Sequence, residues 1–85
     1  MVVSEKVRIF TIPTCSFCKM TKEFLTRKNI AYTDYDISTD SDARDEMSRI
    51  SGQDRSVPVI AVGLNVIIGF DENKIVQALT AVGLA

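Results

Sequence analysis

The chain has 85 residues, 46% of them hydrophobic, which suits one small domain and leaves no room for a second domain of ordinary size. Its 10 Lys and Arg residues against 11 Asp and Glu residues give a net charge of −1, which argues against nucleic acid or an anionic membrane as a partner. The lack of histidine excludes imidazole acid–base catalysis, and two cysteines are too few for a four-ligand zinc site within one chain.

The N-terminal residues carry Glu5 and Lys6 before any apolar run, and no stretch approaches the roughly 20 apolar residues of a membrane-spanning helix. We therefore expect a cytoplasmic monomer that has no membrane partner. Cys15 and Cys18 would close too short a disulfide loop to brace a secreted fold. The cysteine pair is thus predicted to be functional rather than structural.

The first half of the chain predicts a strand, a helix and a second strand. Residues 7–12 form a short apolar run that Pro13 closes, which is typical of a strand. Apolar residues then recur at helical spacing from Phe17 up to Lys28. Residues 30–37 predict a second strand, whose Asp residues suit an exposed face or a sheet edge.

A second helix is predicted after this strand. Residues 38–40 supply N-cap oxygens, and Ala43, Met47 and Ile50 follow at helical spacing. Gly52 stands where a glycine would end the helix. The apolar face is narrow, so we expect most of this helix to be solvated.

The last third of the chain predicts a hairpin and a final helix. Residues 57–62 and 66–68 are apolar runs, and Gly63 followed by Leu64 between them suits a type II′ turn. Asp71 can then cap a helix, whose apolar stripe comprises Ile75, Val76, Leu79 and Val82 and whose end is marked by Gly83.

The predicted order of elements is therefore βαβαββα. A βαβ unit has parallel strands joined by a right-handed crossover, whereas a hairpin has antiparallel strands. The sequence thus predicts an α/β fold, with a four-stranded mixed β-sheet flanked by three helices.

Cys15 and Cys18 form the motif with chemical content, a C-x-x-C pair between the first strand and the first helix. The i, i+3 spacing places both sulfurs on one side of the first turn, close enough to form a disulfide. Free N–H groups and the helix dipole favour a thiolate at Cys15, while Cys18 is placed to attack a mixed disulfide on Cys15. The alternatives are half of a metal site or two unrelated core thiols, but the strand-to-helix position favours redox chemistry.

From residue 7 to residue 79 the chain resembles the glutaredoxins, and in particular the short redoxins that include the electron donors of ribonucleotide reductase. The resemblance rests on Cys15-Ser16-Phe17-Cys18, on Ser56-Val57-Pro58 in place of the family's Thr-Val-Pro loop, and on the turn Gly69-Phe70-Asp71. It implies a thioredoxin fold, a cis Val57–Pro58 peptide, and a role in electron transport and cell redox homeostasis. The implied site residues are Cys15 and Cys18 for catalysis, with no metal, and Phe17, Ser56, Val57, Pro58, Gly69, Phe70 and Asp71 for binding substrate or glutathione.

Several of these residues also have a simpler interpretation. Without the resemblance, Pro58 would be an ordinary trans proline that opens a strand, and Asp71 would only cap the last helix. Phe17 and Phe70 could be core residues, but we expect both to be partly exposed around Cys15. Lys19 and Lys22 could lower the pKa of a thiol, but simple solvation is the favoured interpretation. 

Three departures from the glutaredoxin pattern put glutathione affinity in doubt. Ile12 stands where the family usually carries a lysine, Ile68 replaces the first of two glycines, and Phe17 replaces a tyrosine. None of these changes removes a sulfur. We therefore expect glutathione to be at most a weak co-substrate and no cofactor to be bound.

The leading hypothesis is a thiol-disulfide oxidoreductase that reduces protein or glutathione mixed disulfides through Cys15 and Cys18. Glutathione or thioredoxin reductase would be its electron donor. A first alternative is an iron–sulfur or other metal carrier that uses Cys15 together with glutathione or a second chain. A second alternative is an interaction module without redox activity, which the retention of both cysteines disfavours.

Overall fold

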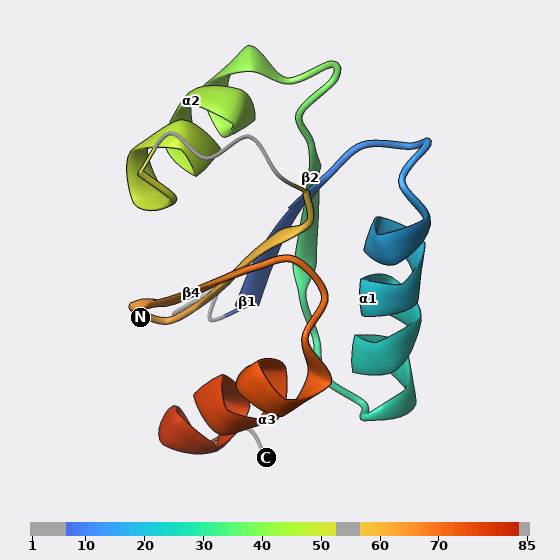
Figure 1. Ribbon diagram of the computed structural model, residues 1–85, viewed down its shortest axis with the longest axis vertical. Helices are drawn as coiled ribbons and strands as arrows, with labels where there is room; N and C mark the ends of the chain where they lie inside the picture. The colour runs from blue at the N-terminus through green and yellow to red at the C-terminus, as the bar shows by residue number, and fades with distance from the viewer. Residues whose placement is uncertain (1–6, 53–56, 84–85) are drawn as a thin grey trace.

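The computed structural model of the chain describes residues 7–52 and 57–83. The order βαβαββα is confirmed (Figure 1). The elements are β1 (Val7–Thr11), α1 (Ser16–Arg27), β2 (Thr33–Asp36), α2 (Ser41–Ile50), β3 (Val59–Val62), β4 (Asn65–Ile68) and α3 (Glu72–Ala81).

The four strands form one mixed sheet in the order β2-β1-β3-β4. β1 pairs in parallel with β2 and antiparallel with β3, and β3 forms the predicted hairpin with β4. β2 is an edge strand, as its Asp residues indicated. The predicted α/β fold, a four-stranded mixed sheet with three helices, is therefore confirmed.

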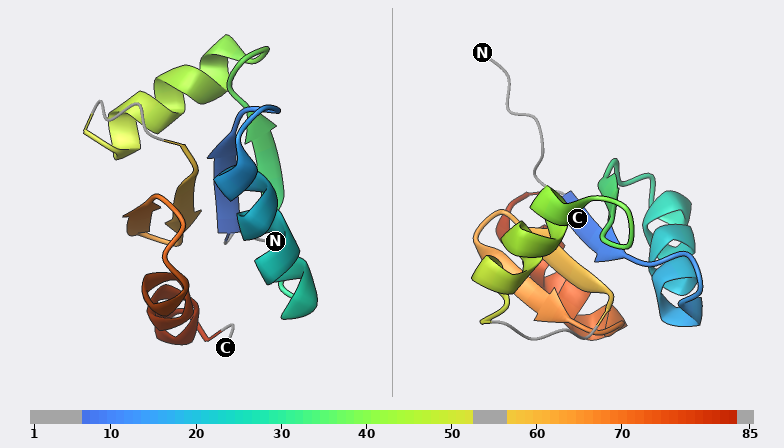
Figure 2. Two further views of the ribbon diagram at one scale, coloured as in Figure 1. Left: turned by 45° about the vertical axis from the view of Figure 1, so that its right-hand side comes forward. Right: turned by 90° about the horizontal axis from the view of Figure 1, so that it is seen from above.

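Each face of the sheet is covered by different helices (Figure 2). Alternate residues of β1 point to opposite faces: Ile9 packs with α1 and α3, whereas Phe10 packs with α2. The core beneath α1 and α3 is the larger, with ten buried residues against five beneath α2. α2 buries only Ala43 and Met47 of its own length, so the prediction of a mostly solvated helix is correct.

Local signals in the sequence explain where several elements begin and end. Asp40 and Asp71 cap α2 and α3 by accepting hydrogen bonds from the N–H groups of Ala43 and Lys74. Gly63 has a φ of 60°, which the first position of a type II′ turn requires. Its two-residue turn sets the register of the β3–β4 hairpin.

The largest corrections to the predicted strand bounds concern the first residues of β2 and β3. β2 begins at Thr33 rather than at residue 30, because Ile30 donates its N–H to the Leu25 carbonyl, and Ile30 and Tyr32 pack against the core beneath α1. β3 begins at Val59, because Val57 and Pro58 form the loop that precedes it. Within the described residues, no helix is both long and apolar enough to cross a bilayer.

Candidate active site

Cys15 is the N-cap residue of α1, at the end of the loop that follows β1. Its backbone is extended, with φ −90° and ψ 118°, and its sulfur accepts the N–H of Cys18 at 3.4 Å. The sulfur thus occupies the position at which an N-cap side chain satisfies a free helical N–H group. This is the placement predicted from the C-x-x-C motif.

Cys18 lies one turn further along α1, and its residue is only 1% exposed. Both cysteines are free thiols, and Cys15 is the more exposed of the two. An exposed sulfur can reach a disulfide on another molecule, whereas a buried sulfur is restricted to a partner already bound at the site. The two thiols therefore differ in accessibility as the sequence predicted.

The surroundings of Cys15 favour its thiolate. Partial burial acts to raise the pKa of Cys15, but hydrogen bonds from the Cys18 thiol and from the N–H groups of Cys18 and Phe17 act against it. The net result is a pKa below that of an ordinary thiol. The direction agrees with the expectation from the helix N-terminus.

The pKa of Cys18 is shifted in the opposite direction. Burial, together with the hydrogen bond and charge of Cys15, raises the pKa of Cys18 to about 11, despite opposing contributions from a backbone hydrogen bond with Ile12 and from the charge of Lys22. At neutral pH, Cys15 is thus the sulfur that more readily exists as a thiolate. This asymmetry separates an attacking thiol from a thiol held in reserve.

The loop before β3 lies beside the exposed sulfur. The Cys15 thiol donates a weak hydrogen bond to the Val57 carbonyl at 3.9 Å, and the Val57–Pro58 peptide is cis, as the resemblance implied. Gly69 donates its N–H to the Pro58 carbonyl at 2.8 Å, which joins the turn after β4 to this loop. Ser56, the remaining member of the predicted loop motif, lies outside the described residues.

The predicted binding residues Phe17, Phe70 and Asp71 differ in exposure and in the contacts they make. Phe17 is 57% exposed in the first turn of α1. Phe70 is only partly buried, but its ring packs edge-to-face on Phe24 of α1 at 5.8 Å, so it contributes to the core beneath α1. Asp71 caps α3, with 3.2 Å between its Oδ1 and the N–H of Lys74. Capping, the simpler interpretation of Asp71, is therefore confirmed.

Two of the three departures from the glutaredoxin pattern lie on segments that adjoin the site. Ile12 precedes the turn that leads to Cys15, and its carbonyl accepts the N–H of Cys15 at 3.3 Å. Ile68 is 42% exposed. It directly precedes Gly69, whose N–H binds the Pro58 carbonyl. Both positions therefore carry an aliphatic side chain in place of the family's lysine or glycine.

One part of the site was missed by the sequence interpretation. Lys22 is not simply solvated, because its Nζ lies 2.8 Å from Oδ2 of Asp34 on β2. The other carboxylate oxygen of Asp34 accepts the hydroxyl of the buried Thr11 at 2.6 Å. Lys19 is exposed, as expected. The pairing depends on which strand residue faces α1, and spacing along the chain does not specify that.

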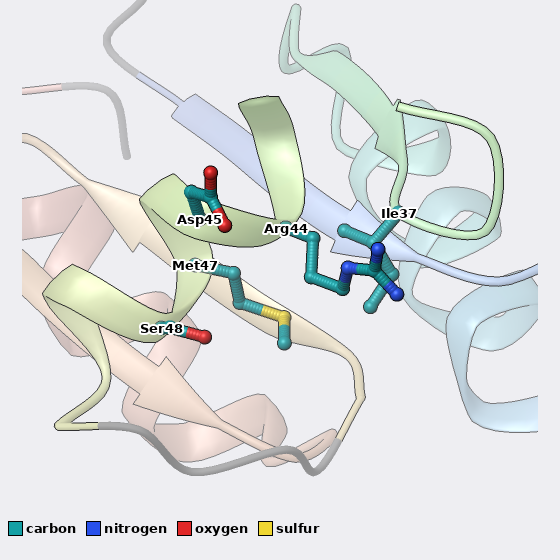
Figure 3. Close-up of a pocket in the computed structure, with 5 residues that line it drawn as sticks. All are labelled: Ile37, Arg44, Asp45, Met47 and Ser48. Carbon is teal, nitrogen blue, oxygen red and sulfur yellow. The ribbon is translucent and has the colours of Figure 1, made fainter. Parts of the chain in front are cut away.

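A hollow of about 410 Å³ lies between α2 and the loop after β2, on the other face of the sheet. In Figure 3, the side chain of Arg44 extends from α2 toward Ile37, and Met47 lies beside it. Neither cysteine lines this hollow. Among the residues that the structure describes, no three Cys, His, Asp or Glu side chains are grouped so that they could bind a metal ion.

The chain is similar in sequence to glutaredoxin-like proteins. Residues 7–67 match the family model described as Glutaredoxin. A Clostridium pasteurianum protein, named an uncharacterized glutaredoxin-like 8.6 kDa protein in the rubredoxin operon, is 42% identical over 69 residues. The match covers 81% of this chain and 91% of that protein.

The chain is also similar in structure to solved proteins. The thioredoxin-like protein BC3987 has 32% sequence identity and a TM-score of 0.81, over 87% of this chain and 100% of that chain. The glutaredoxin of Archaeoglobus fulgidus has 28% identity and a TM-score of 0.78, over 88% of this chain and 86% of that chain. The thioredoxin fold that the resemblance implied is thus confirmed by its likeness to these structures.

Proposed function

The chain belongs to the glutaredoxin family, and on this premise we propose that it is a thiol-disulfide oxidoreductase in which Cys15 attacks and Cys18 resolves. The observation that carries the proposal is the asymmetry of the two thiols. Cys15 caps α1 with a lowered pKa, whereas Cys18 is buried and its pKa is raised to about 11. Members of the family are thiol oxidoreductases, and this pair has the properties that such chemistry needs.

The reaction proceeds by two exchanges of a disulfide bond. The Cys15 thiolate attacks one sulfur of the substrate disulfide, a Cys15–substrate bond forms, and the other substrate sulfur leaves with the electron pair as a thiolate. Cys18 then loses its proton to solvent and attacks Cys15. The Cys15–Cys18 disulfide forms, the second substrate thiolate leaves, and two electrons have passed from the protein to the substrate.

The surface around Cys15 suits a protein disulfide. Val57 lies beside the sulfur in a loop whose peptide groups can pair with an extended segment of substrate. Phe17, in the first turn of α1, is 57% exposed, and Ile68, which precedes the Gly69 that binds the Pro58 carbonyl, is 42% exposed. Exposed apolar side chains of this kind are typical of contacts with other proteins. We therefore propose protein disulfides as the main substrates.

Glutathione is the weaker candidate, both as electron donor and as the smaller half of a mixed disulfide. Asp71 retains a carboxylate that could meet the ammonium group of a γ-glutamyl unit, although the same carboxylate caps α3. Ile12 supplies no cation for a glutathione carboxylate. Thioredoxin reductase is the alternative donor, and it needs no such contact with a tripeptide.

Two cysteine variants test the proposal. Cys18→Ser protein, incubated with an oxidised protein substrate, should accumulate a mixed disulfide on Cys15 that mass spectrometry detects, because the resolving thiol is gone. Cys15→Ser protein should form no adduct, since its remaining thiol is buried. Equal adducts on both variants, or none on either, would refute the assigned roles.

A further inference from the structure

Lys22 is held in place at the edge of the sheet by two contacts in series. Its Nζ lies 2.8 Å from Oδ2 of Asp34, and Oδ1 of Asp34 accepts the Thr11 hydroxyl at 2.6 Å. Thr11 is 2% exposed, so it anchors the carboxylate from inside the protein. The side chains of Lys22 and Asp34 are 34% and 31% exposed, so the pair lies partly out of water.

The residue that carries this anchored ammonium group lies one helical turn after Cys18. Residues four apart on a helix are neighbours on its surface, with about 5–6 Å between their Cβ atoms, and Lys22 follows Cys18 by this spacing on α1. Cys18 is 1% exposed, and a charge acts more strongly on a desolvated group than on a solvated one. Lys22 is accordingly a charge that lowers the pKa of Cys18.

The charged and titratable groups that act on Cys18 and Lys22 come from α1 and its N-cap, from β2, and from the segment that precedes β2. Cys15, the N-cap residue, and Lys22 on α1 both act on Cys18. Asp34 on β2 and Tyr32 just before it act on Lys22. Asp34 also raises the pKa of Lys22 through their hydrogen bond, which keeps the ammonium group charged. The sign of the effect on Cys18 is therefore that of a cation.

The balance of these groups changes once a mixed disulfide has formed. In the reduced protein, the hydrogen bond and charge of Cys15 raise the pKa of Cys18. In the mixed disulfide, the sulfur of Cys15 carries no charge, so that repulsion is gone while burial still opposes ionisation. Lys22 is unaffected by the bond, so its charge remains to favour the Cys18 thiolate.

We propose that Lys22, positioned by Asp34 and Thr11, promotes the resolving step by stabilising the Cys18 thiolate that attacks the mixed disulfide. Lys22 acts through Cys18 and does not touch the substrate, so it is a positioning residue rather than a catalytic one. The inference rests on the proposed function, because it concerns the second of its two exchanges. The proton of Cys18 passes to solvent, and the electron pair of the broken Cys15–substrate bond leaves with the substrate sulfur.

The test uses an aromatic disulfide, dithiobis-nitrobenzoate, whose thiolate product is coloured. In a stopped-flow instrument, reduced protein and an equimolar amount of the reagent should release the product in two phases. The first phase depends on protein concentration and reports the attack by Cys15. The second is independent of concentration and reports the attack by Cys18. Each phase is measured between about pH 5 and 9, where the thiolate fraction of Cys18 is small.

Lys22→Gln should slow the second phase and leave the first phase nearly unchanged. A rise of one unit in the pKa of Cys18 lowers its thiolate fraction tenfold and raises the nucleophilicity of that thiolate by roughly threefold, so the net slowing is about threefold per unit. The pH profile of the second phase should move to higher pH. Lys22→Arg keeps the charge and should restore the wild-type rate, which a loss of packing alone would not do.

Arg27→Gln is the matched control, since it removes one cation from the same helix. Arg27 is exposed and lies nine residues after Cys18, about 13 Å along the axis and beyond the Debye length at physiological salt. The second phase of the Arg27→Gln protein should match that of the wild type. An unchanged second phase in Lys22→Gln, or equal slowing in Lys22→Gln and Lys22→Arg, would overturn the inference.

The same traces separate this inference from the proposed function. If the wild type releases only one equivalent of product, or none rapidly, Cys18 does not resolve and the proposed function itself fails. If both phases are present and Lys22→Gln leaves the second unaltered, the proposed function stands and only the role of Lys22 is wrong.

Discussion

Asp71 has one confirmed role and one proposed role, and substitutions can separate them. Its Oδ1 accepts the N–H of Lys74 at 3.2 Å as the cap of α3, and its carboxylate is also the candidate anchor for a γ-glutamyl ammonium group. Asp71→Ala removes both functions. Asp71→Asn removes only the charge, because asparagine is as good an N-cap residue as aspartate.

The loss of the cap has a predictable size. Replacing an N-cap aspartate with alanine costs about 1 kcal/mol of stability, which for a domain of this length lowers the melting temperature by about 4–8 °C. Asp71→Asn should lose less, since only the interaction with the helix dipole weakens. Asp40→Ala is the matched control: Asp40 caps α2, a helix of the same length on the opposite face of the sheet, through the Ala43 N–H at 3.0 Å.

Two measurements read out the two roles. Thermal unfolding followed by circular dichroism should show similar losses for Asp71→Ala and Asp40→Ala, and an Asp71→Ala protein that melts with the wild type would refute the capping argument. In an assay coupled to glutathione reductase, loss of a charged hydrogen bond should raise the KM for glutathione by about tenfold or more in both Asp71 variants. Asp40→Ala should keep the wild-type KM, and unchanged KM values in both Asp71 variants would show that Asp71 does not bind glutathione.

Three further predictions concern the donor, the core and the hairpin. Ile12→Lys should raise activity with glutathione by about tenfold or more, since it restores a cation for a carboxylate, while reduction by thioredoxin reductase changes less; equal changes with both donors would contradict this. Met47→Ala should lower the free energy of unfolding by about 2–5 kcal/mol, because Met47 is 2% exposed and is one of two buried residues of α2; urea titration would measure the loss. Gly63→Ala should also lower it in that titration, by more than about 0.5–1 kcal/mol, because Gly63 has a φ of 60° and an added Cβ would lie 3.2 Å from Cγ1 of Val82.

The parts of the fold that were predictable from the sequence are those with local signals. Asp40 and Asp71 mark helix starts, and Gly63 marks the hairpin turn, because each acts on backbone within a few residues of itself. The strand at residues 30–37 was predicted too long because its true start depends on contacts with distant parts of the chain. Ile30 and Tyr32 have the composition of a strand, but their side chains pack against the core beneath α1, and no local pattern separates the two uses.

In the site, too, the features set by neighbouring residues were predictable from the sequence and those set by distant residues were not. The position of Cys15 at the start of α1 follows from the motif alone, because the two cysteines and the first helical turn are contiguous. The proximity of Val57 to Cys15 came only from the resemblance, since 42 residues separate them in the chain. The pair of Lys22 and Asp34 was missed because it needs both the rotation of α1 and the register that sets Ile9 opposite Asp34.

The central claim is that the two thiols are unequal, and the most direct measurement of it is the pH dependence of alkylation at each sulfur. Reduced protein would be treated with iodoacetamide over a range of pH, and mass spectrometry would give the rate at each cysteine. Cys15 should react with a midpoint below the value of about 8.5 for an ordinary thiol, while Cys18, with its pKa raised to about 11, should stay nearly unmodified at neutral pH. A common midpoint for both cysteines, or faster labelling of Cys18, would contradict the account.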